Sequence, residues 1–291
     1  MPVATAEPKA VVAAAIKSMG QIATLPEVTS QIISIVEDPN STARDLYQLV
    51  RTDPALSAKI LKVVNSAFYG LPGQVATIDR AIVLLGLSAV KNIAIAASLA
   101  RLFKGGVLDS GFDARELWSH SVAVGTIARM MAKHQGRLGS EEAFLAGLIH
   151  DLGMLIECQT MPRKLVEAIA VQRQQNLTLR EAEQQVLGAD HTEFGTALAE
   201  GWRFPRHLTM VIGYHHEPPK LAAPNRQLPM LIQAADILAC REQLGLTITA
   251  EAPDIDPELL AELGLDADSL AKVLENLPEQ LEASHSTLSV V

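Results

Sequence analysis

The sequence of 291 residues contains few cysteines, few aromatic rings and no block of basic residues. Its two cysteines, Cys158 and Cys240, lie far apart and outside any Cys-x-x-Cys pattern, so they build neither a disulfide framework nor a thiolate zinc site. Unpaired thiols are typical of a reducing compartment, and we therefore expect a cytoplasmic protein.

The charge balance is acidic, with 33 Asp and Glu residues against 24 Lys and Arg residues and a formal net charge of -9. A nucleic-acid surface normally needs a basic patch or stripe, so no nucleic-acid partner is expected. The chain also lacks a Walker-type glycine loop, a Gly-x-Gly-x-x-Gly turn and a Gly-x-Ser-x-Gly elbow. Nucleotide-cofactor and serine-hydrolase chemistry therefore have no support.

The most apolar run, Ala81 to Ala100, is long enough to be tested as a membrane span. Gly86 and Ser88 read as a helix stop followed by a new N-cap, and Lys91 falls inside the second segment. These interruptions predict two buried helices and no membrane association. Residues 1–20 lack a convincing small-residue cleavage site, so no signal peptide is expected.

Helices are predicted throughout, because aromatic residues make up only 4% of the chain and no segment alternates with a period of two. Asp53-Pro54 reads as a cap followed by proline at the first helical position, and capping boxes are expected at Thr42 and Thr178. The all-α prediction places helices at 28–37, 43–52, 54–65, 78–85, 89–103, 113–134, 141–157, 162–174, 179–187, 191–201, 206–216 and 228–243, with short ones at 257–263 and 267–275.

A boundary is expected in the glycine-containing segment 104–112. It divides the chain into an N-terminal extension or helix (1–20), an N-terminal helical part (21–108) and a longer helical part with short C-terminal helices (109–291). The proline-rich segment 217–229 is interpreted as a loop.

Two smaller features receive structural interpretations. Phe68 and Tyr69 are expected to anchor a turn between helices. Gly125 and Gly147, which fall inside predicted helices, are expected at close helix contacts.

Histidines and carboxylates gather between residues 116 and 236. Taken singly, such residues are more often helix caps or solvated polar tips, and His134, His207 and His285 are interpreted as surface residues. An ionised Asp236 inside the apolar run LIQAADILA, however, needs a partner or a metal. Imidazole and carboxylate groups suit zinc, iron or manganese, and an adjacent His-Asp pair can hold one ion while bridging to a second. The candidates are Glu116, His120, His150, Asp151, His191, His215, His216 and Asp236.

The order of these residues resembles the HD phosphohydrolase superfamily, and the element His215-His216-Glu217 is similar to the HD-GYP branch. The stretch from about Leu25 to the helix near Asp236 closely resembles the HDOD domain, the HD-related output domain of bacterial signalling proteins. This resemblance implies an all-helical fold in which an N-terminal bundle packs on an HD-like bundle. It also implies that many relatives act as regulatory modules after losing metal ligands.

Carried over from the HD-GYP pattern, all the candidates except Glu116 occupy ligand positions, and Glu116 matches an extra carboxylate used for a third ion. The resemblance thus implies one to three divalent transition-metal ions, iron or manganese with zinc as an alternative, and a catalytic role for Asp151. Two features depart from the pattern: Met154 replaces a phosphate-binding lysine, and a proline-rich segment replaces the GYP loop. Lys220 and Arg163 are candidates to supply the missing charge.

Three hypotheses follow. The leading one is a signal-transduction module that contacts a signalling protein partner and carries a divalent-metal site in a structural or sensing role. The alternative is a metal-dependent phosphohydrolase or phosphodiesterase acting on a nucleotide or cyclic dinucleotide. The third is a sensor that binds a nucleotide or other phosphate ligand without cleaving it.

Overall fold

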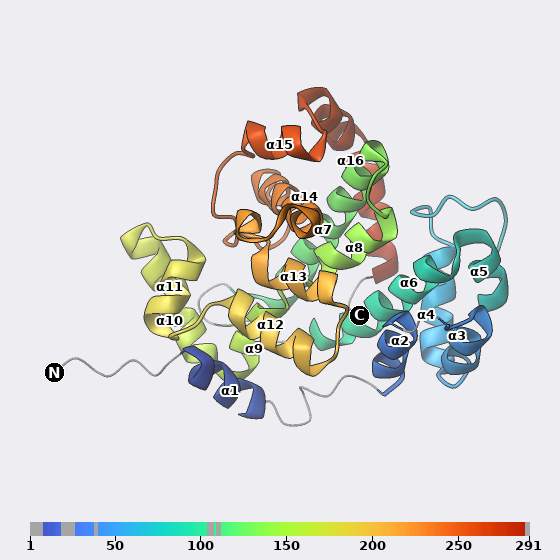
Figure 1. Cartoon of the computed structure of the whole chain (residues 1–291), viewed down its shortest axis with the longest axis horizontal. Helices are drawn as coiled ribbons and strands as arrows, with labels where there is room; N and C mark the ends of the chain where they lie inside the picture. Colours follow the sequence, from blue (N-terminus) through green and yellow to red (C-terminus); the bar gives the residue numbers. More distant parts are fainter. Residues whose placement is uncertain (1–7, 19–26, 38–39, 104–107, 109–111, 289–291) are drawn as a thin grey trace.

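The computed structural model describes residues 8–18, 27–37, 40–103, 108 and 112–288. These residues form helices joined by short connections and contain no β-strand, which confirms the predicted all-α class (Figure 1). The helices are α1 (Pro8–Ser18), α2 (Glu27–Glu37), α3 (Ala43–Val50), α4 (Pro54–Val64), α5 (Ile78–Leu85), α6 (Leu87–Leu99), η2 (Ala100–Phe103), α7 (Ala114–Gln135), α8 (Ser140–Ile149), α9 (Leu152–Thr160), α10 (Pro162–Gln175), α11 (Leu179–Val186), α12 (His191–Gly201), α13 (Arg206–Tyr214), η3 (Pro218–Lys220), α14 (Ala223–Arg241), α15 (Pro257–Leu263) and α16 (Ala267–Leu288).

The helix starts follow local chemistry. The Asp53 carboxylate accepts the Leu56 amide at the start of α4, where Pro54 occupies the first position. The Thr42 and Thr178 hydroxyls accept backbone amides at the starts of α3 and α11, and both capping boxes are complete. These three predicted caps are confirmed.

Helix α7 is the central helix of the second half of the chain, and α8, α14 and α16 pack around it (Figure 1). The contact between α7 and α8 is close because two glycines face each other. A Cβ atom added to Gly147 would lie 2.5 Å from the Cα atom of Gly125. This confirms the packing role predicted for both glycines.

The apolar run from Ala81 to Ala100 forms two helices separated at Gly86, whose φ of 88° is a conformation that glycine favours. Helix α6 lies between α2, α4 and α5 on one side and α8 on the other, so it joins the two halves of the core. No helix in the described ranges has both the length and the apolar character required to cross a bilayer.

Three predicted helix boundaries are wrong. The expected helix 141–157 is broken at His150 and Asp151 into α8 and α9. Helix α14 starts at Ala223, so the second half of the expected loop 217–229 is helical, with Pro229 inside the helix. Helix α16 continues to Leu288 because the Trp118 indole donates to the Leu288 carbonyl and Thr126 donates to Ser284.

The division at 104–112 remains a prediction, because most of that segment lies outside the described residues. Of the N-terminal 20 residues, 8–18 form α1, which packs on α9 and α12, far along the chain. Figure 1 accordingly shows α1 beside α9 and α12 and well apart from α3–α5.

Candidate metal centre

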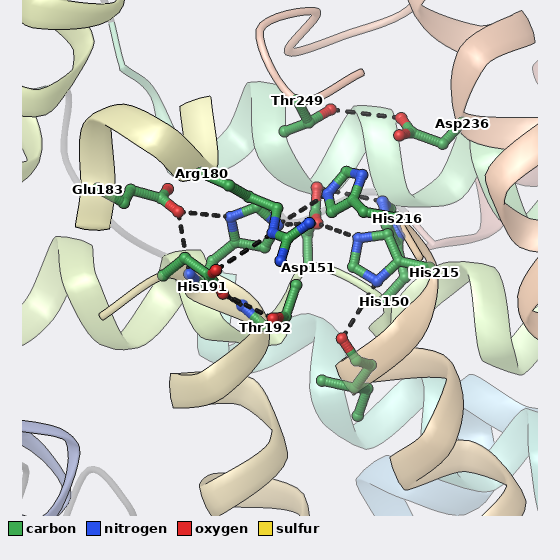
Figure 2. Close-up of polar contacts among 12 residues, drawn as sticks. His150, Asp151, Arg180, Glu183, His191, Thr192, His215, His216, Asp236 and Thr249 are labelled. Carbon is green, nitrogen blue, oxygen red and sulfur yellow. Dashed lines mark hydrogen bonds and ion pairs between the residues drawn. The ribbon is translucent and has the colours of Figure 1, made fainter. Parts of the chain in front are cut away.

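Seven of the eight candidate side chains meet in one buried cluster around Asp151 (Figure 2). They come from α7, the α8–α9 break, the start of α12, the turn after α13 and the middle of α14. Each residue is at most 7% exposed. The cluster consists of His120, His150, Asp151, His191, His215, His216 and Asp236.

Local structure explains how His191 and Asp151, which are far apart in the sequence, come to lie next to each other. Gly153 lies in the first turn of α9, and a Cβ atom there would collide with the carbonyl oxygen of His191. His191 begins α12 directly after Asp190, whose carboxylate accepts the amides of Thr192 and Glu193. Glycine at one helix start and a capped start on the other therefore bring His191 next to Asp151.

Four histidines present Nε2 to the cluster because Nδ1 is engaged elsewhere. The Nδ1 atoms of His120, His150 and His215 lie 3.3, 2.8 and 3.1 Å from the carbonyl oxygens of Leu244, Gly147 and Val211. Nδ1 of His191 lies 2.8 Å from Glu183 Oε2. An acceptor at Nδ1 holds a proton there and directs Nε2 toward the cluster, which is how metal-binding histidines are oriented.

The two oxygens of Asp151 face different histidines. Oδ1 lies 3.6 Å from His191 Nε2 and 3.4 Å from His215 Nε2. Oδ2 lies 3.1 Å from His150 Nε2 and 4.0 Å from His120 Nε2. Asp151 is thus placed between two groups of possible ligands, the arrangement required of a carboxylate that bridges two ions.

Several buried polar atoms in this cluster have no hydrogen-bond partner. They include both carboxylate oxygens of Asp151, Nε2 of His150 and Nε2 of His215. Unsatisfied buried polar atoms are costly, and unsatisfied carboxylates more so. Divalent cations in the two ligand groups that share Asp151 would satisfy these four atoms, so the residues present fit a transition-metal site.

The pKa shifts reflect strong interactions inside the cluster. Burial opposes protonation of His191, but the charge of Glu183 and its hydrogen bond raise the pKa of His191 to about 10. Burial and the neighbouring His215 hold the pKa of His216 well below its usual range. Burial disfavours the charged form of Asp151, yet the adjacent His150 lowers the pKa of Asp151 well below its usual range. Asp151 is therefore ionised, as a metal ligand must be.

Three further residues contact His191 or Asp236 and are not among the sequence candidates. Glu183 on α11 accepts hydrogen bonds from both the backbone amide and Nδ1 of His191. The Thr249 hydroxyl donates to Asp236, 3.3 Å away. Cys240 lies one turn after Asp236 and is close enough to join a ligand group with His120 and Asp236. Nothing in the sequence marks these residues, because their roles depend on contacts between distant segments.

A second buried carboxyl group, Glu157 on α9, lies against Glu183. Burial and the Glu183 charge raise the pKa of Glu157 well above its ordinary value. A protonated Glu157 can donate to Glu183 Oε1, which no other described side chain satisfies. Such a hydrogen bond would give both oxygens of Glu183 a partner, because Oε2 already accepts from His191.

The structure does not bring Glu116 into the cluster, contrary to the ligand role implied by the family resemblance. The Glu116 side chain is exposed, while its carbonyl oxygen accepts the Leu246 amide. Glu116 lies one helical turn before His120, but the direction of its side chain excludes it from the ligand groups seen among the described residues. The geometry therefore gives no carboxylate for a third ion at this position.

The positive charge beside the cluster comes from Arg180 and not from the candidates Lys220 or Arg163. Arg180 pairs with Asp190, Glu217 and Glu251 at distances of 3.2, 2.9 and 3.2 Å. Its charge contributes to the low pKa of His216, and Figure 2 shows its side chain among the ligands. Asp190 and Glu217 directly neighbour His191 and His216 in the sequence, and Glu251 lies two residues after Thr249. Arg180 therefore connects three segments that contribute residues to the cluster.

The other sequence candidates lie further out. Lys220 is 61% exposed in its side chain and pairs with Glu217. Arg163 and His134 are exposed, and His207 is half-exposed and lies 2.9 Å from Glu142. His285, predicted to be a surface residue, is instead half-buried in the last turns of α16, and burial lowers its pKa.

The cluster is enclosed, but a cavity of about 760 Å³ lies next to it. Its lining includes Arg180, Asp190, Thr192 and Glu217, together with Lys9 of α1.

The fold and site define an all-helical protein with a buried histidine and aspartate cluster able to hold metal ions. The sequence pattern of the HDOD domain matches residues 22–218, more than half of the chain. The chain therefore belongs to the HDOD family, which confirms the resemblance seen in the sequence.

Solved structures with this fold cover nearly the whole chain. An HDOD domain protein of unknown function from Geobacter sulfurreducens has 21% identity and a TM-score of 0.81, covering 97% of this chain and 99% of its own. A protein from Shewanella amazonensis SB2B, provisionally named a phosphohydrolase, has 26% identity and a TM-score of 0.71, covering 95% of this chain and 98% of its own.

A curated relative, an uncharacterized protein from Treponema pallidum (strain Nichols), is 28% identical over 216 residues, or 72% of this chain. The match spans only 41% of that relative's length, so the two proteins share part of their architecture.

Proposed function

We propose that this HDOD protein is a regulatory module in signal transduction that holds divalent transition-metal ions in a structural or sensing role. The observation that carries the proposal is the enclosure of the ligand cluster, in which no ligand is more than 7% exposed. A catalytic centre must admit substrate, whereas a structural or sensing centre works while closed. The ions would be held by His120, His150, Asp151, His191, His215, His216 and Asp236.

Contacts with a signalling protein are the proposed output. Val83 and Leu84 on α5 are 73% and 38% exposed, although both are large aliphatic residues. Exposed apolar side chains next to each other favour a protein contact. This supports an interaction surface on the N-terminal helices, away from the metal cluster. The unpaired thiols Cys158 and Cys240 are consistent with the proposed cytoplasmic location.

Metal analysis of untagged protein tests the proposal. We expect a fixed stoichiometry of iron, manganese or zinc that falls at least tenfold in Asp151→Asn, with unchanged helical circular dichroism. His134→Gln, which changes an exposed histidine, is the matched control and should keep its metal. Metal-free wild-type protein, or robust substrate turnover that Asp151→Asn abolishes, would overturn the proposal.

The alternative is a metal-dependent phosphohydrolase or phosphodiesterase acting on a nucleotide or cyclic dinucleotide. The position of Asp151 between two ligand groups favours it, as does the provisional name of the Shewanella amazonensis protein. Bound divalent ions would supply Lewis-acid charge to a phosphate group. Arg180 uses three of its five N–H donors on carboxylates, which leaves two to orient that phosphate from the adjacent cavity.

Activity measurements separate the two functions. Protein loaded with manganese or iron under anaerobic conditions is assayed against mononucleotides and cyclic dinucleotides, with Asp151→Asn as the inactive control. Turnover that Arg180→Ala reduces by about 100-fold would support the hydrolase, since electrostatic contacts to a reacting group contribute on that scale. Binding of a nucleotide without turnover, measured by calorimetry, would instead support the third hypothesis of ligand sensing.

A further inference from the structure

A second cavity, remote from the metal cluster, lies between α7, α16 and the connection after α4. This α7–α16 groove has a volume of about 690 Å³. Its polar lining includes Tyr69, Lys133, His134, Lys272, Asn276 and Gln280. The volume falls within the usual range of about 300 to 1,000 Å³ for small-molecule sites.

The groove is basic in a chain whose formal net charge is -9. Lys133 on α7 and Lys272 on α16 both contribute to its wall, and none of the residues that line it is acidic. Both lysines are exposed, and neither forms a salt bridge within the ranges that the structure describes. Hydrogen bonds from the Ser269 hydroxyl and amide lower the pKa of the nearby Asp266, and the charges of His134 and Lys272 lower it further.

Three of the residues that line the groove, Phe68, Tyr69 and Arg129, interact with one another or with Glu141 across the two halves of the chain. The Arg129 guanidinium lies 3.9 Å from the centre of the Phe68 ring and pairs with Glu141 at 2.8 Å. The Tyr69 hydroxyl donates to the same Glu141 carboxylate at 2.5 Å. Arg129 is therefore neutralised, whereas the charges of Lys133 and Lys272 remain available to a ligand.

The lining favours a small anion over a protein segment. Protein interfaces are centred on large, buried apolar contacts, but the aliphatic side chains that line this groove are limited to Ala67, Met130 and Val273. The amide groups of Asn276 and Gln280 can instead accept or donate hydrogen bonds to hydroxyl or base groups. Two lysines from different helices, with amides beside them, suit a compact polyanion.

We propose that the α7–α16 groove binds a phosphate-bearing small molecule, with Lys133 and Lys272 contacting the phosphate oxygens. The ligand would touch α7, which also carries the metal-cluster residue His120, and the connection at Tyr69 in the N-terminal helices. It would therefore sit where the helices on either side of residues 104–112 meet. This site is separate from the phosphate chemistry considered for the metal cluster.

Pyrophosphate is the probe, titrated by calorimetry into the full chain with its native metal content. We expect saturable binding with a Kd of about 1 mM or tighter. Lys133→Gln and Lys272→Gln should each weaken binding about tenfold, and Lys164→Gln, which changes an exposed lysine on α10, should leave it unchanged. Absence of saturable binding, or equal binding by all three variants, overturns the proposal.

Repeating the titration with Asp151→Asn separates this site from the metal cluster. Binding that persists in Asp151→Asn and disappears in the double variant Lys133→Gln/Lys272→Gln supports the groove. Binding lost in Asp151→Asn but kept in the lysine double variant places the probe at the metal cluster and overturns the proposal, while leaving the proposed metal site intact.

Discussion

The first half of the molecule, α2–α6, and the second half, α7–α16, are both helical but bury very different side chains. The buried polar residues described in the first half are Thr29, Lys91 and Ser98. The Lys91 ammonium donates to the Ile35 carbonyl and the Ser41 hydroxyl at 2.9 and 2.8 Å. Apart from the Thr29 hydroxyl, these groups find partners within the chain.

In the second half, by contrast, the Asp151 carboxylate and the adjacent histidine nitrogens are buried without partners. Stability alone would not retain such groups, because replacing them with apolar residues would remove a desolvation cost. The difference supports the metal site that we propose for the second half, because the described residues of the first half contain no comparable cluster. Substitutions in each half should therefore affect different measurements.

The largest expected effect concerns the carboxylate behind His191. Glu183→Leu removes the acceptor that orients His191 and should weaken metal binding about 10- to 100-fold, the usual cost of losing such a partner. Competition with a chelating dye measures the affinity. Glu200→Leu on exposed α12 surface is the control, and equal affinities for the two variants would show that Glu183 does not orient a ligand.

The contact between α7 and α8 should be the most sensitive point of packing. Gly147→Ala places a methyl group 2.5 Å from the Gly125 Cα atom and should lower the free energy of unfolding by about 1 to 3 kcal/mol, the range for overpacked cores. Urea denaturation measures it. Gly201→Ala, where a Cβ atom meets nothing within 4 Å, should leave stability unchanged or slightly higher.

Lys91→Met tests the first half. The substitution keeps the aliphatic stem but leaves two partly buried oxygen partners without the ammonium, which should lower the free energy of unfolding by about 1 to 2 kcal/mol. Lys62→Met on the exposed face of α4 is the matched control in the same denaturation experiment. Metal content should be the same in both variants, and a loss of metal in Lys91→Met would contradict the separation of the two halves.

The smallest effect comes from a matched pair of helix caps. Thr42→Ala and Thr178→Ala each remove one capping-box hydroxyl and should each lower the free energy of unfolding by about 1 kcal/mol. Only Thr178→Ala should also speed metal release to a chelator, because α11 carries Arg180 and Glu183. Similar release rates for the two variants would contradict that link.

The sequence predicts helix starts better than helix ends. Caps such as Asp53 and Thr178 act through side chains a few residues away, so local spacing reveals them. Helix α14 starts before the predicted residue 228, and α16 ends after the predicted residue 275. Pro229 and Pro278 lie inside these two helices, where tertiary packing outweighs the lost hydrogen bond. The break at His150 and Asp151 lies between two apolar segments, and the Asp151 side chain does not cap α9.

The candidate metal-binding residues could be named from the sequence because their order along the chain resembles the family pattern. Their supporting residues could not, since Glu183 and Arg180 lie in a helix that reads as an ordinary polar surface helix. Glu116 is a sequence candidate that the structure keeps outside the cluster. Its spacing of four residues from His120 places the two side chains near each other but does not decide which one points inward. Contacts between distant segments decide these positions.

Helix α1 is synthesised long before the helices against which it packs. It buries Val12 and Ala15, and it packs against α9 and α12, which end at Gly201. At ribosomal speeds of about 5 to 20 residues per second, α1 waits roughly 10 to 40 s for these partners to emerge. During that time the apolar face of α1 is accessible to chaperones. Helices α2–α6 can pack together before α1 packs against α9 and α12.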